Sequence, residues 1–345
     1  MREAPLEQVN VLQLTNAGAK HSAALISITI YPVNAPTMAT VIVFGPTGNN
    51  GSVAAQTAHQ NGAKVWLAMR DPSKAIPGLT PAAEKAGNYS RVQADLSKPD
   101  TVAAAVKTAG ATRAFIYVAQ GTPDYMKGTA EALKAAGVEF VVLLSSSTIG
   151  HTPHADVPPS EFIPYTHARL EVTLDEVYGP DGYVAVRPGA FATNLLRQRE
   201  GIRAGEVKMY GPGFKIDCIT PVDLGGVIGT ILAEGPRDGQ RKVFVYGPQI
   251  LSQKQGLEII GEVLGKEVKV SGIVAEEALA QYLAKGAPKP MAEYMIRSLG
   301  DTDPELEDGS WLAHYKEGME NVKKYTGKPP TGFREWVEAN SELFK

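Results

Sequence analysis

The chain has 345 residues, of which 43% are hydrophobic and 21% are charged, so it can bury the core of one large domain and a smaller lobe. Its 34 basic and 37 acidic residues give a formal net charge of −3, which excludes a general attraction to nucleic acid or to an anionic membrane. Cys218 is the single cysteine, so no internal disulfide and no cysteine-based metal cage can form. We expect a cytoplasmic protein in which Cys218 packs as a small apolar side chain rather than acting as a nucleophile.

Residues 1–37 precede the first recognisable element, and we interpret them as an N-terminal extension that is poorly ordered or loosely packed. Their apolar run 23–31 is too short to cross a bilayer and is followed by Pro32. The run lies far from the start and lacks a preceding basic region, so we do not expect a secretory signal.

The strongest functional signal is the apolar strand 40–44, which runs into a glycine-rich turn and then a helix that begins near Asn49. Glycines in this pattern let the chain turn sharply, let the backbone approach a pyrophosphate and let the helix pack closely on the sheet. The helix start would direct free N–H groups toward the phosphates. An ordinary tight turn is the alternative. We predict a dinucleotide site with contacts from Gly45, Thr47, Gly48, Asn49, Asn50 and Gly51.

Arg70 indicates which dinucleotide is bound. Gly62 ends the helix after the glycines, and the buried strand 64–69 completes a βαβ unit. About twenty residues after the last glycine, where an NAD site places an acid on the ribose 2′-hydroxyl, the chain has Arg70. A guanidinium matches a 2′-phosphate, and Lys74 could add a second positive charge, so we predict NADP(H). Asp71 argues for NAD, but its side chain should point away from that of Arg70.

The alternation of strands and helices continues and predicts an α/β fold with a Rossmann-type, doubly wound parallel sheet. The expected strands are 90–94, 114–118, 140–144 and 183–186, with helices near 98–109, 124–136 and 165–178. Small or polar residues follow these strands, where a ligand would lie. Asp95 could accept a hydrogen bond from the adenine amino group or cap the next helix. The further expected cofactor contacts are Asp95, Leu96, Ala119, Gln120, Ser145, Pro188, Gly189 and Phe191.

The pattern becomes less regular after Phe191. We predict a short strand and turn at 207–213, a helix at 221–232 and a strand at 242–246 that rejoins the sheet at its edge. The remaining helices should build a smaller, mainly helical C-terminal lobe; they are expected near 252–264, 275–285, 288–299 and 309–325, with a closing segment 331–344. Tyr282, Met291, Tyr294 and Met295 could give this lobe an apolar wall for a planar substrate, although plain core packing also explains them.

These elements predict three parts of the chain. After the extension 1–37, an NADP-binding domain covers 38–250, in which 196–220 contribute to the substrate lobe, and the lobe itself covers 251–345. The substrate would lie in the cleft between domain and lobe.

The loop that contains His151, His154 and Asp156 gathers two imidazoles and a carboxylate within six residues. No matching set of ligands stands out elsewhere in the sequence, and proline-rich loops commonly collect such polar residues. We therefore expect no metal site and instead interpret the loop as a border of the substrate cleft.

The run from Met38 to about Leu232 resembles the atypical short-chain dehydrogenases/reductases. Within them it is similar to the NmrA-like family, which also takes in isoflavone-reductase-like enzymes and NADP-sensing regulators. The closing segment 327–336 also resembles the end of this family. The resemblance implies a Rossmann fold and NADP(H) but does not identify a substrate. The segments that carry it are Gly45-Pro46-Thr47-Gly48-Asn49-Asn50-Gly51, Arg70-Asp71-Pro72-Ser73-Lys74, Ala94-Asp95-Leu96, Leu144-Ser145-Ser146, Arg187-Pro188-Gly189 and Ile219-Thr220-Pro221-Val222-Asp223.

The resemblance also implies candidate catalytic residues. Short-chain dehydrogenases generally use a tyrosine as proton donor, a lysine four residues later and a serine after the fifth strand. Tyr165 and Arg169 have this spacing with arginine in place of lysine, and Ser146 matches the serine. One helical turn separates Tyr165 from Arg169, so both face the same side. A guanidinium can bond ribose hydroxyls and favour a phenolate, but it stays protonated and cannot pass a proton onward.

A second alignment leaves another proton donor open. Many NmrA-like proteins carry a lysine a few residues before a glutamate, which we place at Glu171, and His167 then occupies the position of the lysine. An imidazole can donate a proton near neutral pH. The further alternative is an amphipathic helix in which Tyr165 is merely packed.

Two functions remain open at this point. The first is an NADPH-dependent reductase that transfers hydride to a small aromatic or conjugated carbonyl, quinone or enone, and Ser146, Tyr165 and the apolar lobe favour it. The second is a non-catalytic NADP(H)-sensing regulator that binds a partner protein, which the replacement of lysine by Arg169 favours. We expect a small-molecule substrate and neither nucleic acid nor membrane as a partner, and a homodimer stays open.

Overall fold

The computed structural model describes residues 38–150, 152–300 and 314–345. The predictions for the extension 1–37, for His151 and for the start of the helix expected near 309–325 lie outside the described residues. No helix within the described ranges is both long and apolar enough to cross a membrane.

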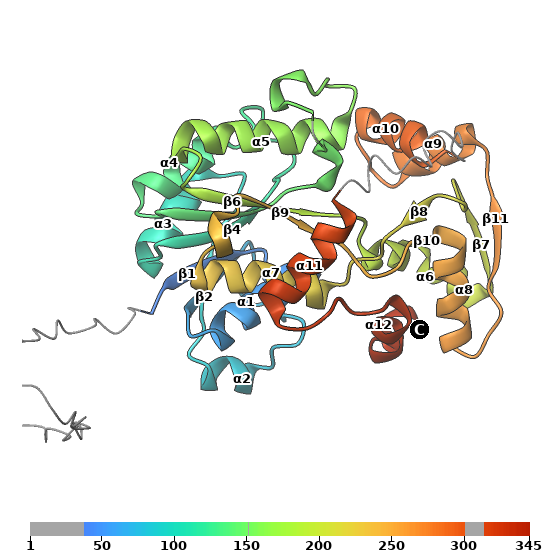
Figure 1. Ribbon diagram of the computed structural model, residues 1–345, viewed down its shortest axis with the longest axis horizontal. Helices are drawn as coiled ribbons and strands as arrows, with labels where there is room; N and C mark the ends of the chain where they lie inside the picture. Colours follow the sequence, from blue (N-terminus) through green and yellow to red (C-terminus); the bar gives the residue numbers. More distant parts are fainter. Residues whose placement is uncertain (1–37, 151, 301–313) are drawn as a thin grey trace, which may run out of the picture. The chain divides into compact units, whose positions relative to one another are not determined.

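Seven parallel strands form one sheet in the order β3-β2-β1-β4-β5-β6-β9. Figure 1 shows this sheet between layers of helices. This order, which reverses between β1 and β4, confirms the doubly wound Rossmann-type fold. The prediction that the last strand joins the edge of the sheet is also confirmed. The strands are β1 (Thr40–Phe44), β2 (Lys64–Met69), β3 (Ser90–Gln93), β4 (Arg113–Tyr117), β5 (Phe140–Leu144), β6 (Tyr183–Pro188) and β9 (Lys242–Val245).

Helices cover both faces of the sheet because successive strand side chains point to opposite sides. In β1, Val41 and Val43 pack in one apolar core, and Ile42 and Phe44 pack in the other. The first core lies under α1 (Asn49–Gln60), α7 (Pro221–Glu234) and α11 (Tyr315–Thr326). The second lies under α3 (Pro99–Ala109), α4 (Lys127–Ala135) and α5 (Phe162–Tyr178), and the short α2 (Pro81–Ala86) precedes β3.

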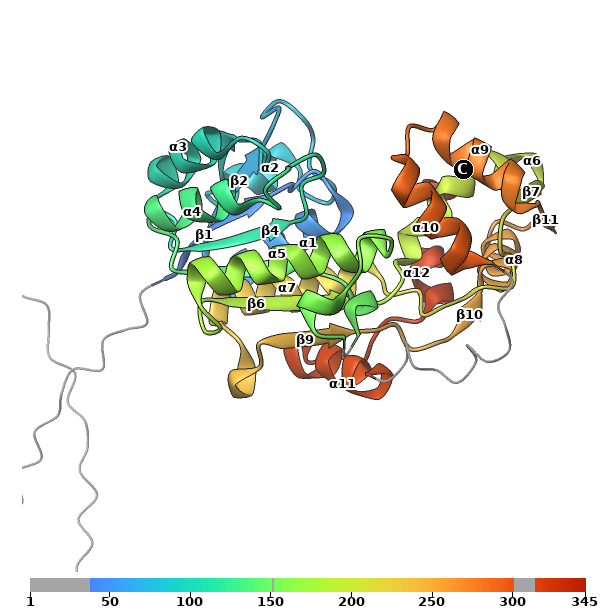
Figure 2. The same ribbon diagram turned by 90° about the horizontal axis from the view of Figure 1, so that it is seen from above.

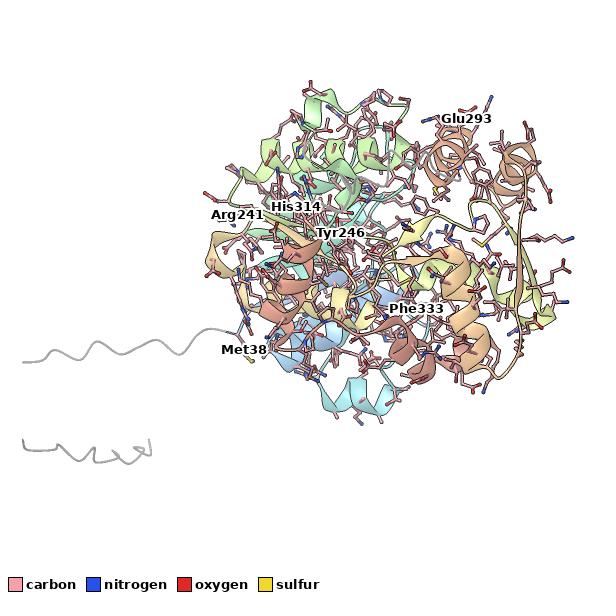
Figure 3. The ribbon with its side chains drawn as sticks, turned by 45° about the vertical axis from the view of Figure 1, so that its right-hand side comes forward. Met38, Arg241, Tyr246, Glu293, His314 and Phe333 are labelled. Atoms are coloured by element: carbon pink, nitrogen blue, oxygen red, sulfur yellow. The ribbon has the colours of Figure 1, made fainter. Side chains whose placement is uncertain are left out.

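Helix α11 differs from the prediction, which placed it in the C-terminal lobe. It packs against α7 and β9, and its Val322 and Tyr325 belong to the core of the sheet domain. At the same edge of the sheet His314 stacks on Phe244, with ring centroids 3.7 Å apart. Figure 3 shows His314 near Tyr246. An amphipathic pattern shows which face of a helix is apolar but not which surface it covers, so the boundary at residue 250 does not hold for this helix.

The C-terminal lobe lies at the carboxyl ends of the strands (Figure 2). Its core includes Leu257, Phe333 and Trp336, and Tyr294 of the predicted apolar wall is also buried. Two small strand pairs, β7 with β11 and β8 with β10, frame it. Its elements are α6 (Arg199–Ala204), β7 (Glu206–Met209), β8 (Lys215–Ile216), β10 (Leu251–Ser252), α8 (Gln253–Val263), β11 (Lys269–Gly272), α9 (Ala275–Ala284), α10 (Lys289–Leu299) and α12 (Phe333–Ala339). Short 3-10 helices span Ser147–Ile149, His154–Asp156, Ala192–Gln198, Arg237–Gly239 and Ser341–Phe344.

Helix α7 crosses α1 at very short range, and glycine makes this possible. A Cβ added at Gly229 would lie 2.6 Å from the carbonyl oxygen of Ala54, whereas one at Gly226 would meet only a methyl group of Thr326 at 3.1 Å. We expect Gly229→Ala to destabilise the protein by about 1–3 kcal/mol, because overpacking forces the two helices apart. Gly226→Ala on the same helix is the control for helix propensity. Equal urea midpoints for the two variants would contradict this interpretation.

Candidate functional site

The glycine-rich turn between β1 and α1 shows why glycine occurs at two of its three positions. Gly45 has a φ of 68°, in the left-handed region. A Cβ at Gly51 would lie 2.3 Å from the carbonyl oxygen of Gly45. Gly48 is the N-cap of α1, and it is exposed and provides no side-chain cap. Thr47, Asn49 and Asn50 lie on this turn and are partly or fully exposed, so the helix start is open to an anion.

Tyr117, the last residue of β4, stands over this turn and was missed by the sequence analysis. A Cβ at Gly45 would come within 2.7 Å of its ring, and 37% of Tyr117 remains exposed. Burial raises the pKa of its phenol, while the Arg70 charge lowers it and the Asp95 charge raises it. Tyr117 therefore lies among three of the predicted cofactor-binding residues. The sequence signal that could have identified Tyr117 is an aromatic residue at the carboxyl end of a predicted strand.

Arg70 directly follows β2 and is exposed, as is Lys74. Oδ1 of Asp71 accepts hydrogen bonds from the Ser73 N–H at 3.0 Å and from the Ser73 hydroxyl at 2.6 Å. This oxygen is therefore not available to bind a ribose hydroxyl. These bonds lower the pKa of Asp71. Arg91 also stabilises this turn, because its Nη1 donates hydrogen bonds to the carbonyl oxygens of Pro72 and Lys74. The turn thus presents Arg70 on an ordered loop.

Asp95 forms a similar turn after β3. Its Oδ1 accepts from the N–H and the hydroxyl of Ser97 at 3.0 and 2.8 Å, and these bonds lower its pKa. The N-cap of α3 is Lys98, so Asp95 is not a helix cap, contrary to that alternative. Leu96 is buried, and its carbonyl oxygen accepts a hydrogen bond from the Thr129 hydroxyl.

A cavity of about 150 Å³ opens between the loop after β4 and helix α5. Ala119 and Gln120, both predicted cofactor contacts, line one side of it. Tyr125 and Phe162 provide aromatic walls. The other lining residues are Val118, Gly121, Thr122, Met126, Thr166 and Leu170. This is an apolar space of the size of a small ring, next to the helix that carries the candidate proton donors.

Tyr165 and Arg169 lie beside each other on α5, and Tyr125 joins them from the loop after β4. The Tyr125 and Tyr165 hydroxyl oxygens are 3.2 Å apart, and the two rings pack edge to face. The Arg169 guanidinium lies 5.2 Å from the centroid of the Tyr125 ring. Nε of Arg169 is buried and has no hydrogen-bond partner in the described part of the chain. Tyr125 had not been predicted, since nothing in the sequence brings it to Tyr165.

The other two candidate catalytic residues are engaged elsewhere. Nδ1 of His167 lies 2.9 Å from the carbonyl oxygen of Ile163, one turn back on the same helix. Burial lowers the pKa of His167, so its imidazole is neutral near pH 7. Ser146 accepts a hydrogen bond from the Thr148 N–H, and the two hydroxyl oxygens are 2.8 Å apart.

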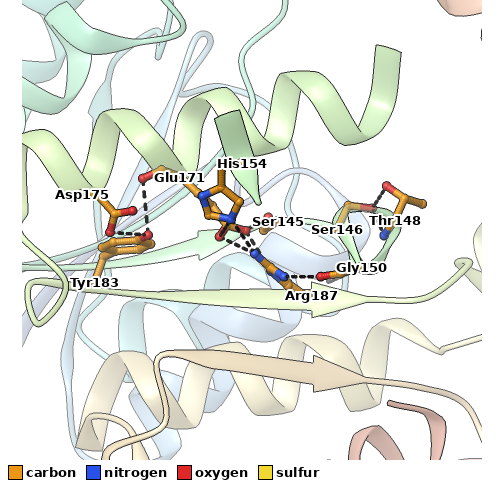
Figure 4. Close-up of polar contacts among 9 residues, drawn as sticks. All are labelled: Ser145, Ser146, Thr148, Gly150, His154, Glu171, Asp175, Tyr183 and Arg187. Carbon is orange, nitrogen blue, oxygen red and sulfur yellow. Dashed lines mark hydrogen bonds and ion pairs between the residues drawn. The ribbon is translucent and has the colours of Figure 1, made fainter. Parts of the chain in front are cut away.

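Glu171 is the centre of a buried polar cluster (Figure 4). The Ser145 hydroxyl donates to its Oε1 at 2.5 Å, and Nε and Nη2 of Arg187 donate to its two oxygens at 3.0 and 2.6 Å. Nε2 of His154 lies 3.2 Å from Oε2. Burial alone would raise the pKa of Glu171, but the bonds from His154, Arg187 and Ser145 outweigh it and lower the pKa to about 2. Ser145 is thus tied to α5.

The segment after β6 is fixed by a second buried carboxylate. Oδ1 of Asp217 accepts from the Ala190 N–H at 2.6 Å, and Oδ2 accepts from the Gly247 N–H at 2.9 Å. A Cβ at Gly189 would lie 2.2 Å from Oδ1, so this glycine is required by packing. Pro188 is the buried end of β6, and Phe191 forms a bridge with Ile219. Their expected cofactor contacts stay predictions.

The metal hypothesis and the reactive-cysteine alternative gain no support. His154 takes part in the Glu171 cluster, and in the described ranges no three His, Cys, Asp or Glu side chains are grouped so as to hold a metal ion. Cys218 is buried, and burial raises the pKa of its thiol, so the reactive thiolate is disfavoured.

Comparison with known proteins identifies the family of this chain. The family model described as the NmrA-like family matches residues 37–307. The chain belongs to the NmrA-like family. This membership confirms the resemblance carried by the glycine-rich turn and the segments after the strands.

Two curated relatives match this NmrA-like protein over most of its length. A nitrogen metabolite regulation-like protein of Gibberella fujikuroi is 35% identical over 322 residues, which cover 88% of this chain and 97% of the relative. An NAD(P)H azoreductase of Xenophilus azovorans is 26% identical over 309 residues, which cover 88% of this chain and 99% of the relative. The two relatives carry names of different functional classes, one regulatory and one enzymatic.

Among solved structures, an NADPH-dependent quinone oxidoreductase of Escherichia coli in complex with NADPH aligns with a TM-score of 0.62 at 20% identity. The alignment covers 88% of this chain and 100% of that chain. At this identity the likeness shows a shared fold.

Proposed function

We propose that this NmrA-like protein is an NADPH-dependent reductase of small aromatic or conjugated carbonyl, quinone or enone compounds. The observation that carries the proposal is the group of Tyr165 and Arg169 on α5 with Tyr125, which also lines an apolar cavity between the loop after β4 and α5. It combines an acid, a cation and an apolar space in one place. The azoreductase relative supports the same reaction class.

The residues present fit NADP(H). The exposed N-cap Gly48 provides no side-chain cap, so the first N–H groups of α1 can bind the phosphates. Arg70 and Lys74 would hold the 2′-phosphate. The buried, unpartnered Nε of Arg169 is a donor suited to a ribose hydroxyl. When bound, the dinucleotide supplies a hydride at nicotinamide C4.

Tyr165 donates the proton that balances the hydride. Its O–H gives a proton to the oxygen of the substrate as negative charge develops there, and the fixed charge of Arg169 stabilises the phenolate that remains. Ser146, the serine that the family resemblance implies, would have to turn its hydroxyl from Thr148 to orient the acceptor oxygen. His167 is the less suitable acid, because it is neutral and its Nδ1 faces the Ile163 carbonyl. Val118, Phe162 and Leu170 exclude water from the substrate side.

The regulatory alternative rests on one observation. The Gibberella fujikuroi relative, which is named as a regulation-like protein, matches 88% of this chain. A protein of this kind binds NADP(H), changes its C-terminal surface and acts on a partner protein without turnover. A homodimer is also compatible with the fold. We also propose a cytoplasmic location, because the single, buried thiol of Cys218 suits a reducing compartment.

The test of the proposed function is NADPH oxidation against a panel of quinones, enones and aromatic ketones. A reductase consumes NADPH with at least one of these classes. The regulatory alternative gains if the whole panel is inert while NADP and NADPH give different protease-cleavage patterns in the C-terminal lobe.

Cofactor preference provides a separate prediction. We expect NADP(H) to bind at least about tenfold more tightly than NAD(H), because charge-assisted contacts to one phosphate contribute about 1.5–3 kcal/mol. Arg70→Ala should remove most of this ratio in calorimetric titration. Lys64→Ala, at the amino end of the same strand, should leave the ratio unchanged. Equal affinities of the unmodified protein for the two dinucleotides would contradict the assignment of Arg70.

A further inference from the structure

Tyr125 and Tyr165 form a hydrogen-bonded pair of phenols from two separate elements. Their oxygens are 3.2 Å apart and their ring centroids 5.7 Å apart, in an edge-to-face arrangement. Forty residues of sequence separate them. Arg169, one turn after Tyr165 on α5, faces the Tyr125 ring. The cation therefore lies against one phenol ring and one helical turn after the other phenol.

The loop that carries Tyr125 is held in an unfavourable backbone conformation. Tyr125 has a φ of 51° and Met126 a φ of 64°, in the left-handed region that side chains other than glycine rarely adopt. Asp124 stabilises this conformation, since its Oδ1 accepts from the Met126 N–H at 3.1 Å and its Oδ2 from the Gly128 N–H at 2.8 Å. Met126 is buried. The loop thus directs the Tyr125 hydroxyl to Tyr165 at a conformational cost.

The replacement of lysine by Arg169 creates a specific chemical need. Once Tyr165 has given its proton to a substrate, the phenolate must regain one before the next turnover. Arg169 cannot return it, because a guanidinium does not deprotonate in proteins. The hydroxyl of Tyr125 is within hydrogen-bond distance of the Tyr165 oxygen, and Tyr125 is only partly buried. Tyr165 is partly buried to the same degree, and Tyr125 also lines the cavity after β4, so its hydroxyl offers the Tyr165 oxygen an additional route to water.

We propose that Tyr125 is a proton relay that returns a proton from water to Tyr165 after each reduction. The inference rests on the proposed reductase function. The O–H bond of Tyr165 breaks as its proton passes to the substrate oxygen; the proton of Tyr125 then moves to the Tyr165 phenolate, and the Tyr125 phenolate takes a proton from water. Each turnover consumes one hydride and one proton, and no other reactant is required.

The charges around the pair are consistent with this order of transfer. The hydrogen bond to Tyr165 raises the pKa of Tyr125, and burial adds to it, whereas Arg169 lowers it. Tyr125 therefore keeps its proton while Tyr165 acts. Asp124 is the other charged group next to Tyr125, and its two oxygens are engaged by backbone N–H groups.

The first test needs neither cofactor nor substrate. Tyrosinate absorbance is titrated in the unmodified protein, in Tyr125→Phe, in Tyr165→Phe and in the double variant. In a coupled pair the remaining O–H donates to the first phenolate, so the effects of the two single substitutions on the titration should not add up to that of the double variant. Tyr178→Phe, whose hydroxyl has no hydrogen-bond partner among the described residues, controls for loss of one phenol. Additive titrations of the two single variants would overturn the relay.

The second test separates hydride transfer from turnover with any substrate that the panel yields. Tyr125→Phe should lower steady-state turnover about tenfold more than it lowers the single-turnover rate, and it should change the solvent isotope effect on turnover. Unchanged turnover, or a single-turnover rate lowered as much as steady-state turnover, would overturn the relay even where the titrations are coupled. If the unmodified protein reduces nothing, the proposed function fails together with the relay, while the titration still reports whether the phenols are paired.

Discussion

Replacing Tyr165 by phenylalanine should lower turnover by about 10²-fold or more while NADPH affinity stays unchanged. The variant removes one oxygen atom, so the O–H that protonates the substrate is lost while the ring still packs against Ile149, Val157 and Ala168. General acid catalysis usually contributes a factor of about 10²–10⁴. Steady-state NADPH oxidation measures the loss, and calorimetric titration measures the affinity.

His167→Asn is the matched comparison on the same helix. If Tyr165 is the acid, this variant loses little activity, because the neutral His167 ring faces a backbone carbonyl of its own helix. A silent Tyr165→Phe together with an inactive His167→Asn would instead make the histidine the acid and would refute the assignment of Tyr165.

Glu171→Gln should be the most destabilising single change in the buried polar cluster, at about 3–5 kcal/mol. It leaves the guanidinium of Arg187, which is 1% exposed, without its carboxylate partner. The double variant Glu171→Gln with Arg187→Met removes the uncompensated charge and should recover part of the loss. The free energy of unfolding in urea measures both.

Glu176→Gln is the control for a charge on the same helix. Its ion pair with Lys127 is exposed, so we expect a change within about 0.5 kcal/mol. If Glu171→Gln were equally mild, the cluster would contribute nothing to stability.

The same carboxylate predicts a dependence of stability on pH. The pKa of Glu171 is about 2 in the folded protein against an ordinary 4.5. As the pH falls, the carboxylate is therefore protonated in the unfolded chain before it is protonated in the folded protein. The stabilisation is therefore complete above about pH 4.5 and is lost as the pH falls toward 2, and it corresponds to about 3 kcal/mol. Glu171→Gln should flatten the curve of unfolding free energy against pH in this window.

Much of the fold could be predicted from the sequence because its signals are local. The apolar runs and the glycines that end them define each strand and turn, and parallel strands of this kind alternate with helices. The position of α11 could not be predicted, because its apolar face fits either the lobe or the edge of the sheet. The position of α11 is set by Val322 and Tyr325, which pack in the core of the sheet domain against residues distant in the sequence.

The candidate site divides in the same way. Arg70 and the glycines follow from position along a βαβ unit, and the turns at Asp71 and Asp95 could have been read from the serine two residues after each aspartate. The contact of Tyr125 with Tyr165 could not be predicted from the sequence, because the two residues are forty positions apart and the loop that carries Tyr125 has an unusual backbone conformation. Sequence spacing places side chains along one element but not across two.

The most direct test of the central claim is a transfer experiment with NADPH that carries deuterium at the transferable C4 position. The unmodified protein is incubated with the panel of quinones, enones and aromatic ketones, and the products are examined by mass spectrometry. We expect the label on a carbon of at least one product, with the accompanying proton drawn from solvent. Tight binding of NADPH with no label in any product would contradict the reductase assignment and favour the regulator.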